Sequence, residues 1–237
     1  VNTIVRYVVL IVVGFIMIYP LIWMVGATFK TNNEIFSGIG FIPKNPTLDG
    51  YKNALKSYGG DIDIFKAMIN TYSIVLPKVV FTIVSATITA YGFARVEFRG
   101  KKLLFAVLMS TLFLPQVVLN VPQFVLFNKF GWIDSPIYLA LIVPTMFATD
   151  TYFVFMLIQF LRNIPKELEE AAYIDGCNRF TAFIRVLIPI AKPGVVVCSV
   201  FSFLYAWGDL AYGMTFIIDQ TKRPITAGIF NFMGQYG

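Results

Sequence analysis

Five long apolar runs with almost no charge decide what this 237-residue chain can fold into. They cover residues 7–28, 67–94, 103–128, 135–161 and 193–218, and the only charged residues inside them are Lys78, Asp150 and Asp209. A helix needs about 20 apolar residues to cross the hydrocarbon core of a bilayer. The runs lack the period of two that marks barrel strands, so they predict an all-α, polytopic integral membrane protein with five spans.

The overall composition supports this class and excludes others. Charged residues make up 14% of the chain, against about 25% in soluble domains. The net charge of +6 does not indicate nucleic-acid binding, because no basic stripe alternates with stacking aromatics. The chain has no histidine, which excludes a His-containing metal site. Its two cysteines, Cys177 and Cys198, are expected to be free thiols.

The placement of arginine and lysine predicts the orientation in the membrane. Cytoplasmic loops carry an excess of these residues. If the N-terminus lies inside, six of the seven arginines fall in cytoplasmic segments and only Arg223 falls outside. We therefore expect a multi-pass protein of the cytoplasmic (inner) membrane with a cytoplasmic N-terminus. Residues 29–66 and 219–237 are then external loops, and residues 162–192 form a cytoplasmic loop.

That cytoplasmic loop contains the signals of a short helix. Pro165 suits the first helical position, and the acids at Glu167, Glu169 and Glu170 suit the positive end of a helix dipole. Gly176 can end the helix. The pattern predicts a helix over residues 165–175, and the small side chains of Ala171 and Ala172 give it a flat side that a partner can approach closely.

The same loop carries a motif with fixed spacing. Glu170-Ala171-Ala172 is followed after three residues by Gly176, and after nine more by Val186-x-Ile188-Pro189. This resembles the coupling signature of ABC importer permeases, whose pattern is Glu-Ala-Ala, three residues, Gly, nine residues, Ile-x-Leu-Pro. Val186 and Ile188 depart from it but keep apolar branched side chains. Glu-Ala-Ala alone is common in helices, whereas the full spacing in a basic loop between two spans is specific.

Other segments resemble the MalG-type branch of that family, the binding-protein-dependent carbohydrate permeases. They are Tyr91-Gly92-Phe93-Ala94-Arg95, Ile164-Pro165-Lys166-Glu167-Leu168 and Trp207-Gly208-Asp209. The likeness runs over residues 1–237, which implies a single transmembrane permease domain. It further implies a sixth span beyond Gly237, so we expect the chain to be truncated. Residues 219–237 resemble the place where these permeases carry a loop that reaches into the binding protein, with an ordinary connector as the alternative.

The resemblance implies a transmembrane subunit of an ATP-driven importer for sugars, with oligosaccharides the expected class. It implies as partners a second permease subunit in a heterodimer, two ATP-binding subunits and an external solute-binding protein. The chain has no Gly-x-x-x-x-Gly-Lys-Ser/Thr loop, so we expect no ATPase site in this chain. ATP and Mg²⁺ are expected in the partner subunits.

The resemblance also implies roles for the residues of the motif. Residues 165–175 act as a lever, with Glu170 offering a carboxylate to the ATPase. Gly176 makes a sharp turn and Pro189 sets the angle of re-entry. The role of Asp175 stays open between coupling and helix-end solubility.

Polar side chains inside the spans are candidates for the solute path, because they are costly in a bilayer. Asp150 and Asp209 either line this path or lie at an interface or in a salt bridge, with Lys78 as a possible counter-ion. Asn120 and Gln123 flank Pro122 and either bind sugar hydroxyls or satisfy a helix kink. Tyr205 and Trp207 either stack on a sugar ring or belong to the interfacial aromatic belt.

Two other functions remain as alternatives. One is an ABC importer permease for another solute, such as a polyamine or an oxyanion. An anion site needs converging cations at mid-membrane, where only Lys78 is available. The other is an ion-coupled secondary carrier that uses Asp150 and Asp209 as relays. That function leaves the spacing of residues 165–189 unexplained.

Overall fold

The structure, a computed structural model, describes residues 3–55 and 63–236. Every regular element in these ranges is helical, which confirms the all-α class. The chain forms two compact units, Val1–Ile64 and Phe65–Gly237, and each is described by itself.

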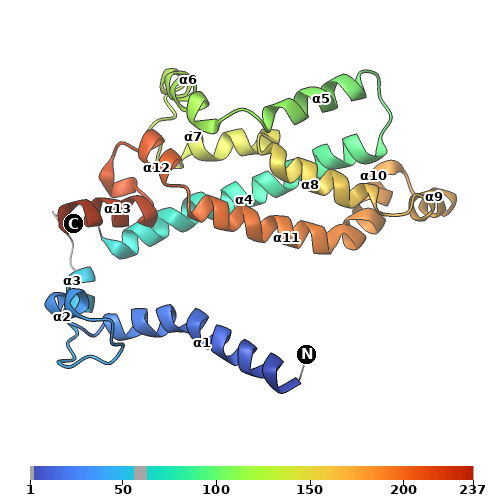
Figure 1. The fold of residues 1–237 in the computed structure, drawn as a ribbon. Coiled ribbons are helices and arrows are strands. Elements are labelled where there is room, and N and C mark those ends of the chain that lie inside the picture. Colours follow the sequence, from blue (N-terminus) through green and yellow to red (C-terminus); the bar gives the residue numbers. More distant parts are fainter. Residues whose placement is uncertain (1–2, 56–62, 237) are drawn as a thin grey trace. The chain divides into compact units, whose positions relative to one another are not determined.

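The first unit consists of one long helix and two short ones (Figure 1). Helix α1 spans Thr3–Ala27, α2 spans Asn32–Ser37 and α3 spans Asp49–Ala54. The chain after α1 folds back, so that the Thr47 amide donates to the Phe29 carbonyl at 2.9 Å. The Tyr51 hydroxyl also donates to Thr28 Oγ1 at 3.0 Å. Residues 56–62 of the predicted external segment 29–66 lie outside the described ranges.

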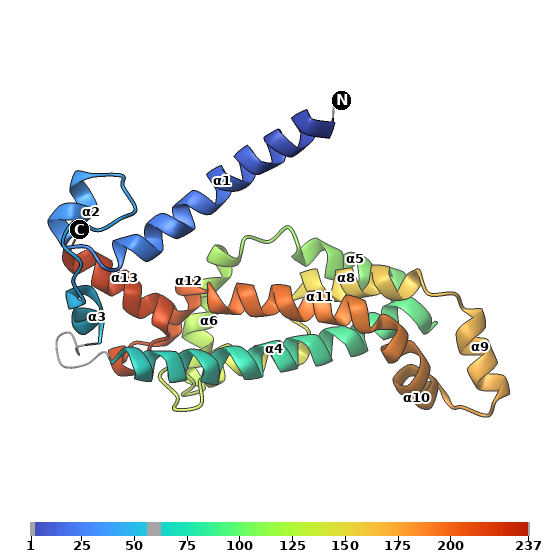
Figure 2. The same cartoon turned by 90° about the horizontal axis from the view of Figure 1, so that it is seen from below.

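Three helices form the centre of the second unit: α4 (Ile64–Arg95), α8 (Thr151–Arg162) and α11 (Ile188–Trp207). Helices α4 and α11 run alongside each other (Figure 2), and α8 packs against α11. Their contact faces hold the fully buried side chains Ala86, Val154, Ile158, Leu161 and Ala191. Small residues allow close approach, and a Cβ on Gly194 would lie 2.7 Å from the Phe160 ring.

Four helical segments in the described ranges are long and apolar enough to span a membrane. They are Thr3–Ala27, Ile64–Arg95, Leu139–Arg162 and Arg179–Trp207. The first two match the predicted spans 7–28 and 67–94 closely. The third joins α7 (Leu139–Ile142), η1 (Val143–Phe147) and α8. It corresponds to the predicted span 135–161 but is interrupted at Ala148, whose φ is +53°.

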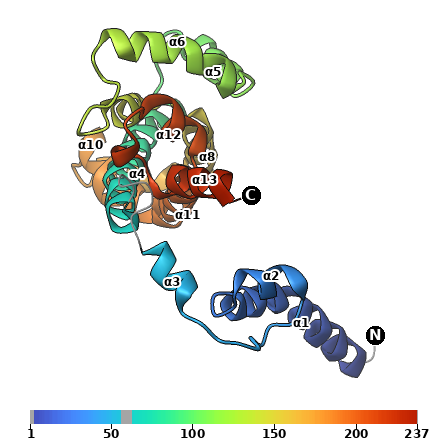
Figure 3. The same cartoon turned by 90° about the vertical axis from the view of Figure 1, so that its left-hand side faces the viewer.

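The predicted span 103–128 is not one helix. It consists of α5 (Lys101–Thr111) and α6 (Gln116–Lys129), and neither reaches 18 residues. The break falls at Pro115, which has no amide hydrogen and disfavours helical geometry in the residue before it. Viewed from the end in Figure 3, both helices lie on the same side of the group formed by α4, α8 and α11. A count of five spans therefore needs α5 and α6 to cross the bilayer together.

The predicted span 193–218 is displaced toward the N-terminus. Helix α10 (Arg179–Ala182) continues through the π-helical turn η2 (Phe183–Leu187) into α11, which ends at Trp207. The sequence predicts that Pro189 sets the angle at which the chain re-enters the membrane. In the structure Pro189 lies inside the continuous helical run from Arg179 to Trp207. The π-turn precedes Pro189, where an ordinary α-turn would bring its ring against the carbonyl of Arg185.

Helix α12 (Leu210–Phe216) follows α11 as a separate element. The sequence predicts a loop over residues 219–237, but the described part of this segment is mostly helical: it holds η3 (Gln220–Lys222) and α13 (Ile225–Tyr236). Asn70 of α4 fixes this segment, because its Nδ2 donates to the Thr221 carbonyl at 2.9 Å and to the Arg223 carbonyl at 3.2 Å. A second apolar cluster joins Phe127, Tyr138 and Phe216 at this end of the unit.

Candidate functional site

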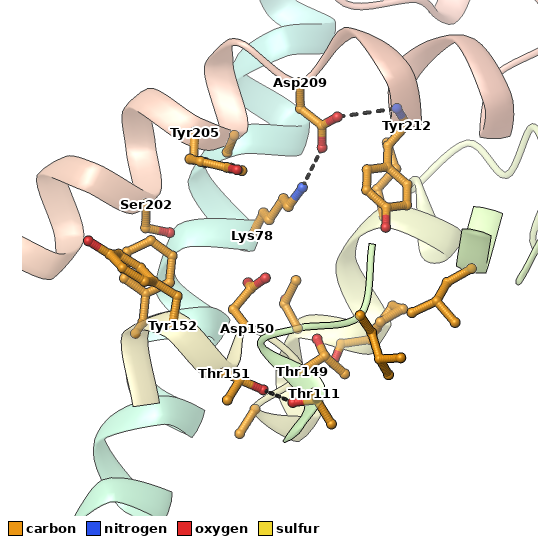
Figure 4. A pocket seen from close by; sticks show the side chains of 18 of the residues that line it. Lys78, Thr111, Thr149, Asp150, Thr151, Tyr152, Ser202, Tyr205, Asp209 and Tyr212 are labelled. Carbon is orange, nitrogen blue, oxygen red and sulfur yellow. Dashed lines mark hydrogen bonds and ion pairs between the residues drawn. The ribbon is translucent and has the colours of Figure 1, made fainter. Parts of the chain in front are cut away.

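A cavity of about 1090 Å³ lies within the second unit, between α4, α5, α6, α8, α11 and α12 (Figure 4). Its walls are mostly apolar, with polar side chains from several helices. The polar residues that line the cavity include Lys78, Gln123, Asp150, Thr151, Tyr205 and Asp209. A mostly apolar hollow with a few convergent polar groups is typical of a small-molecule site.

Lys78 and Asp209 form an ion pair in this cavity. Lys78 Nζ lies 2.9 Å from Asp209 Oδ2, and the two side chains are only 18% and 16% exposed. Asp209 also accepts the Tyr212 amide through Oδ1 at 3.2 Å, which caps the start of α12. Lys78 Nζ lies 5.6 Å from the centre of the Tyr212 ring. The pair therefore fixes the corner between α11 and α12 to α4.

Asp150 lies directly before α8 and faces the same cavity as Lys78 (Figure 4). Its Oδ2 accepts the Thr82 hydroxyl at 2.9 Å, and Thr82 is 1% exposed. Among the described residues Asp150 forms no ion pair. Thr151 and Thr111 join their hydroxyls at 2.7 Å beside it. The cavity thus holds one carboxylate neutralised by Lys78 and one whose only side-chain hydrogen bond within the described part of the chain comes from a hydroxyl.

The other predicted path residues divide into two groups. Gln123 and Tyr205 line the cavity, whereas Asn120 and Trp207 do not. Asn120 Oδ1 and Gln123 Oε1 are buried and have no hydrogen-bond partner in the described ranges. Trp207 packs edge-on against Tyr72 with ring centroids 5.4 Å apart. No sequence signal marked Thr111 or Tyr212, because only the fold brings their helices to the cavity.

A short helix forms where the sequence predicts one, at the opposite end of the second unit from α12 (Figure 2). Helix α9 spans Glu167–Ile174, two residues later than Pro165 and one short of Asp175. Gly176 has φ +86°, a left-handed conformation that suits glycine. The Cys177 amide donates to the Ala172 carbonyl at 2.9 Å and the Gly176 amide to the Tyr173 carbonyl at 3.0 Å. This is the Schellman arrangement, and it explains the glycine in the motif.

The motif residues differ in exposure. Glu170, Ala171, Asp175 and Pro189 are exposed, whereas Ala172 is buried. Val186 and Ile188 are half-buried, and Ile188 packs against the core of the second unit. Two free cysteines are present, Cys198 buried and Cys177 partly exposed. One face of α9 is therefore open to a partner, while Ile188 near the end of the motif packs against the core.

Residues 79–236 match the family of binding-protein-dependent transport system inner membrane components. The chain belongs to this family. It is therefore a membrane-embedded transport subunit, and the predicted membership of the ABC importer permeases is confirmed.

Several curated permeases are similar over most of their length. The trehalose transport system permease of Mycobacterium tuberculosis is 34% identical, over 94% of this chain and 79% of the relative. A putative ABC transporter permease of Caldicellulosiruptor is 30% identical, over 92% of this chain and 77% of the relative. The diacetylchitobiose uptake permease of Streptomyces coelicolor is 29% identical, over 93% and 71%.

The fold is also found in a solved transporter. A chain in the crystal structure of a bacterial ABC transporter involved in alginate import matches with a TM-score of 0.83. The match covers 99% of this permease and 81% of that chain at 19% identity. It therefore shows a shared permease fold.

Proposed function

We propose that this permease carries oligosaccharides, in a complex with a second permease subunit, two ATP-binding subunits and an external solute-binding protein. The observation that carries the proposal is the cavity, whose volume of about 1090 Å³ is at the upper end for small-ligand pockets. Its hydroxyl, amide and carboxylate groups are of the kind that bind sugar hydroxyls. Relatives named for trehalose, diacetylchitobiose and galactooligosaccharides support the same solute class.

The charges of the cavity favour a neutral sugar over an anion. Lys78 is neutralised by Asp209, and Asp150 adds a carboxylate without a cationic partner among the described residues. An oxyanion entering this space meets repulsion rather than converging cations. The same carboxylate makes a cationic solute such as a polyamine the second candidate. An ion-coupled secondary carrier is disfavoured for two reasons. Asp209, one of its two candidate relay carboxylates, is already paired with Lys78. The spaced motif over residues 170–189 also has no role in such a carrier.

In this proposal α9 is the contact with an ATP-binding subunit. Glu170 and Ala171 lie on its exposed face, and the Gly176 turn fixes the direction in which the chain leaves it. Closure of the ATPase dimer moves α9 and switches the spans between inward-open and outward-open states. The partner subunits bind ATP and Mg²⁺ and hydrolyse ATP. The arginine distribution supports a cytoplasmic N-terminus, with residues 162–192 inside and residues 29–66 and 219–237 outside.

A solute panel tests the proposal. The importer complex is purified through a tag on this chain, reconstituted in proteoliposomes with its binding protein, and assayed for ATP hydrolysis. Trehalose, diacetylchitobiose, a galactooligosaccharide, an alginate oligosaccharide and spermidine are added separately. We expect stimulation by at least one neutral oligosaccharide and none by the alginate fragment. Stimulation by spermidine alone would overturn the sugar assignment in favour of the polyamine.

A further inference from the structure

A buried polar cluster attaches α9 to the end of α4. Tyr91 and Arg95 lie one turn apart near the end of α4, and Glu169 and Tyr173 lie one turn apart on α9. Glu169 Oε1 accepts the Tyr173 hydroxyl at 2.5 Å and the Tyr91 hydroxyl at 3.2 Å. Arg95 Nε lies 3.8 Å from Glu169 Oε2. The carboxylate of Glu169 on α9 is thus shared with α4 residues that lie 74 and 78 positions earlier in the chain, and no sequence pattern links them.

Arg95 connects a third helix to this cluster. Its Nη2 donates to the Leu161 carbonyl at 2.7 Å and to the Ile164 carbonyl, at the C-terminal end of α8. A cation at this end of a helix also interacts favourably with the helix dipole. The Arg95 guanidinium therefore contacts α8 and α9 while its own backbone belongs to α4.

The charges in the cluster are withdrawn from water. The side chains of Arg95 and Glu169 are 3% and 10% exposed. Burying an ion pair costs desolvation free energy that only good partners offset. Arg95 Nε has no hydrogen bond in the described ranges, so its link to Glu169 is a charge interaction. Burial and the hydrogen bond to the Glu169 carboxylate raise the pKa of the Tyr173 hydroxyl, so Tyr173 keeps the proton that it donates to Glu169 to a higher pH than an ordinary tyrosine does.

Two adjacent glutamates thus face opposite ways. Glu170 is exposed on the face of α9 that a partner can reach, whereas Glu169 is buried against α4. A force applied to α9 at its exposed face must pass into the spans through its buried face. Without a firm attachment there, α9 would tilt on its flanking turns and leave the spans where they are.

We propose that Arg95 and Glu169 are positioning residues that transmit the movement of α9 to α4 and α8 during transport. This inference rests on the proposed coupling role of α9. It differs from a purely stabilising role, because it requires the number of solute molecules carried per ATP to depend on the pair.

Glu169→Gln tests the inference with little change in shape. The amide oxygen of glutamine still accepts the two tyrosine hydroxyls, but the charge facing Arg95 is lost. Glu167→Gln is the matched control, since Glu167 is exposed on the same helix. Both variants are assayed in the reconstituted complex with the five-solute panel, for ATP hydrolysis and uptake in parallel. We expect Glu169→Gln to hydrolyse ATP but to carry about tenfold less solute per ATP. The control should match the unmodified complex.

The outcomes separate this inference from the proposed function. If no panel solute stimulates the unmodified complex, the proposed function fails. If the unmodified complex works and Glu169→Gln carries the same amount of solute per ATP, the inference is overturned, even when both rates fall together. If Glu169→Gln does not assemble, Glu169→Asp decides, because it keeps the negative charge while its shorter side chain draws the carboxylate away from Arg95. We then expect a smaller fall in solute carried per ATP, and an unchanged ratio would overturn the inference.

Discussion

Asp209 carries two structural tasks at one residue. Its Oδ2 pairs with Lys78 and its Oδ1 caps α12 through the Tyr212 amide. Both charged side chains are largely buried, in a unit whose surroundings include lipid. Charges in such places are costly and persist where they hold elements together or serve a solute path. The corner between α11 and α12 is therefore fixed by charge as well as by apolar packing.

Asp209→Asn separates these two tasks. Asparagine keeps an oxygen that caps α12 but leaves Lys78 buried without a counter-ion. We expect a loss of about 3–5 kcal/mol in the free energy of unfolding, the usual cost of removing one partner of a buried pair. The double variant Lys78→Met/Asp209→Asn should recover most of this loss, since neither charge remains. The measurement is thermal unfolding of the purified complex in detergent. An unfolding temperature unchanged by Asp209→Asn would contradict the account.

Individual residues show what the sequence could and could not predict. Gly176 and the helix before it were predicted, because the left-handed turn and the acidic helix start are local signals. Lys78 was predicted as a counter-ion, but only the fold shows that its partner is Asp209 and not Asp150. Glu169 was assigned to the helix start like its neighbours. Its burial against Arg95 depends on a contact between distant segments, which local patterns do not encode.

At the scale of elements, helix boundaries depend on prolines in different ways. Pro115 separates α5 from α6, whereas Pro77, Pro122, Pro189 and Pro193 lie inside continuous helices. Before Pro189 the π-turn η2 absorbs the missing hydrogen bond. The apolar pattern alone cannot distinguish these cases. For this reason the predicted spans 103–128 and 193–218 have the wrong boundaries while α4 is nearly right.

The packing of α8 against α11 depends on Gly194. A Cβ there would lie 2.7 Å from the Phe160 ring, so Gly194→Ala forces the two helices or the ring to move. We expect a loss of about 1–3 kcal/mol in the free energy of unfolding from overpacking. Gly92→Ala on α4 is the matched control, since nothing lies within 4 Å of its added Cβ. The control should be neutral or stabilise by about 0.5–1 kcal/mol. Equal unfolding temperatures for the two variants would show that the close approach does not limit packing.

At the scale of the whole molecule, the second unit has two distinct ends. Helices α9 and α10 lie at one end and α12 and α13 at the other (Figure 2). The cavity lies between the helices of the same unit. This separation suits a permease driven from the cytoplasm and loaded from outside. It requires that residues near α9 and residues near α12 face opposite sides of the membrane.

Cysteine labelling tests that orientation. Arg99→Cys and Lys129→Cys are made separately in a background with Cys177→Ser and Cys198→Ser, and both positions are exposed. A membrane-impermeant maleimide is applied to cells whose outer envelope is permeabilised while the cytoplasmic membrane stays closed. It is applied separately to inside-out vesicles. We expect Lys129→Cys to react in the cells and Arg99→Cys to react in the vesicles. The reverse pattern would place α9 outside and would contradict the coupling proposal.

Coupling through α9 is tested most directly by measuring uptake and ATP hydrolysis when its exposed face, or the turn that follows it, is altered. Glu170→Ala and Gly176→Val are compared with the unmodified chain in the reconstituted complex, using the solute that stimulates it most. We expect both variants to insert into the membrane in normal amounts but to lose solute-stimulated ATP hydrolysis and uptake together. Normal uptake by both variants, or uptake that continues without any ATP-binding subunit, would contradict it.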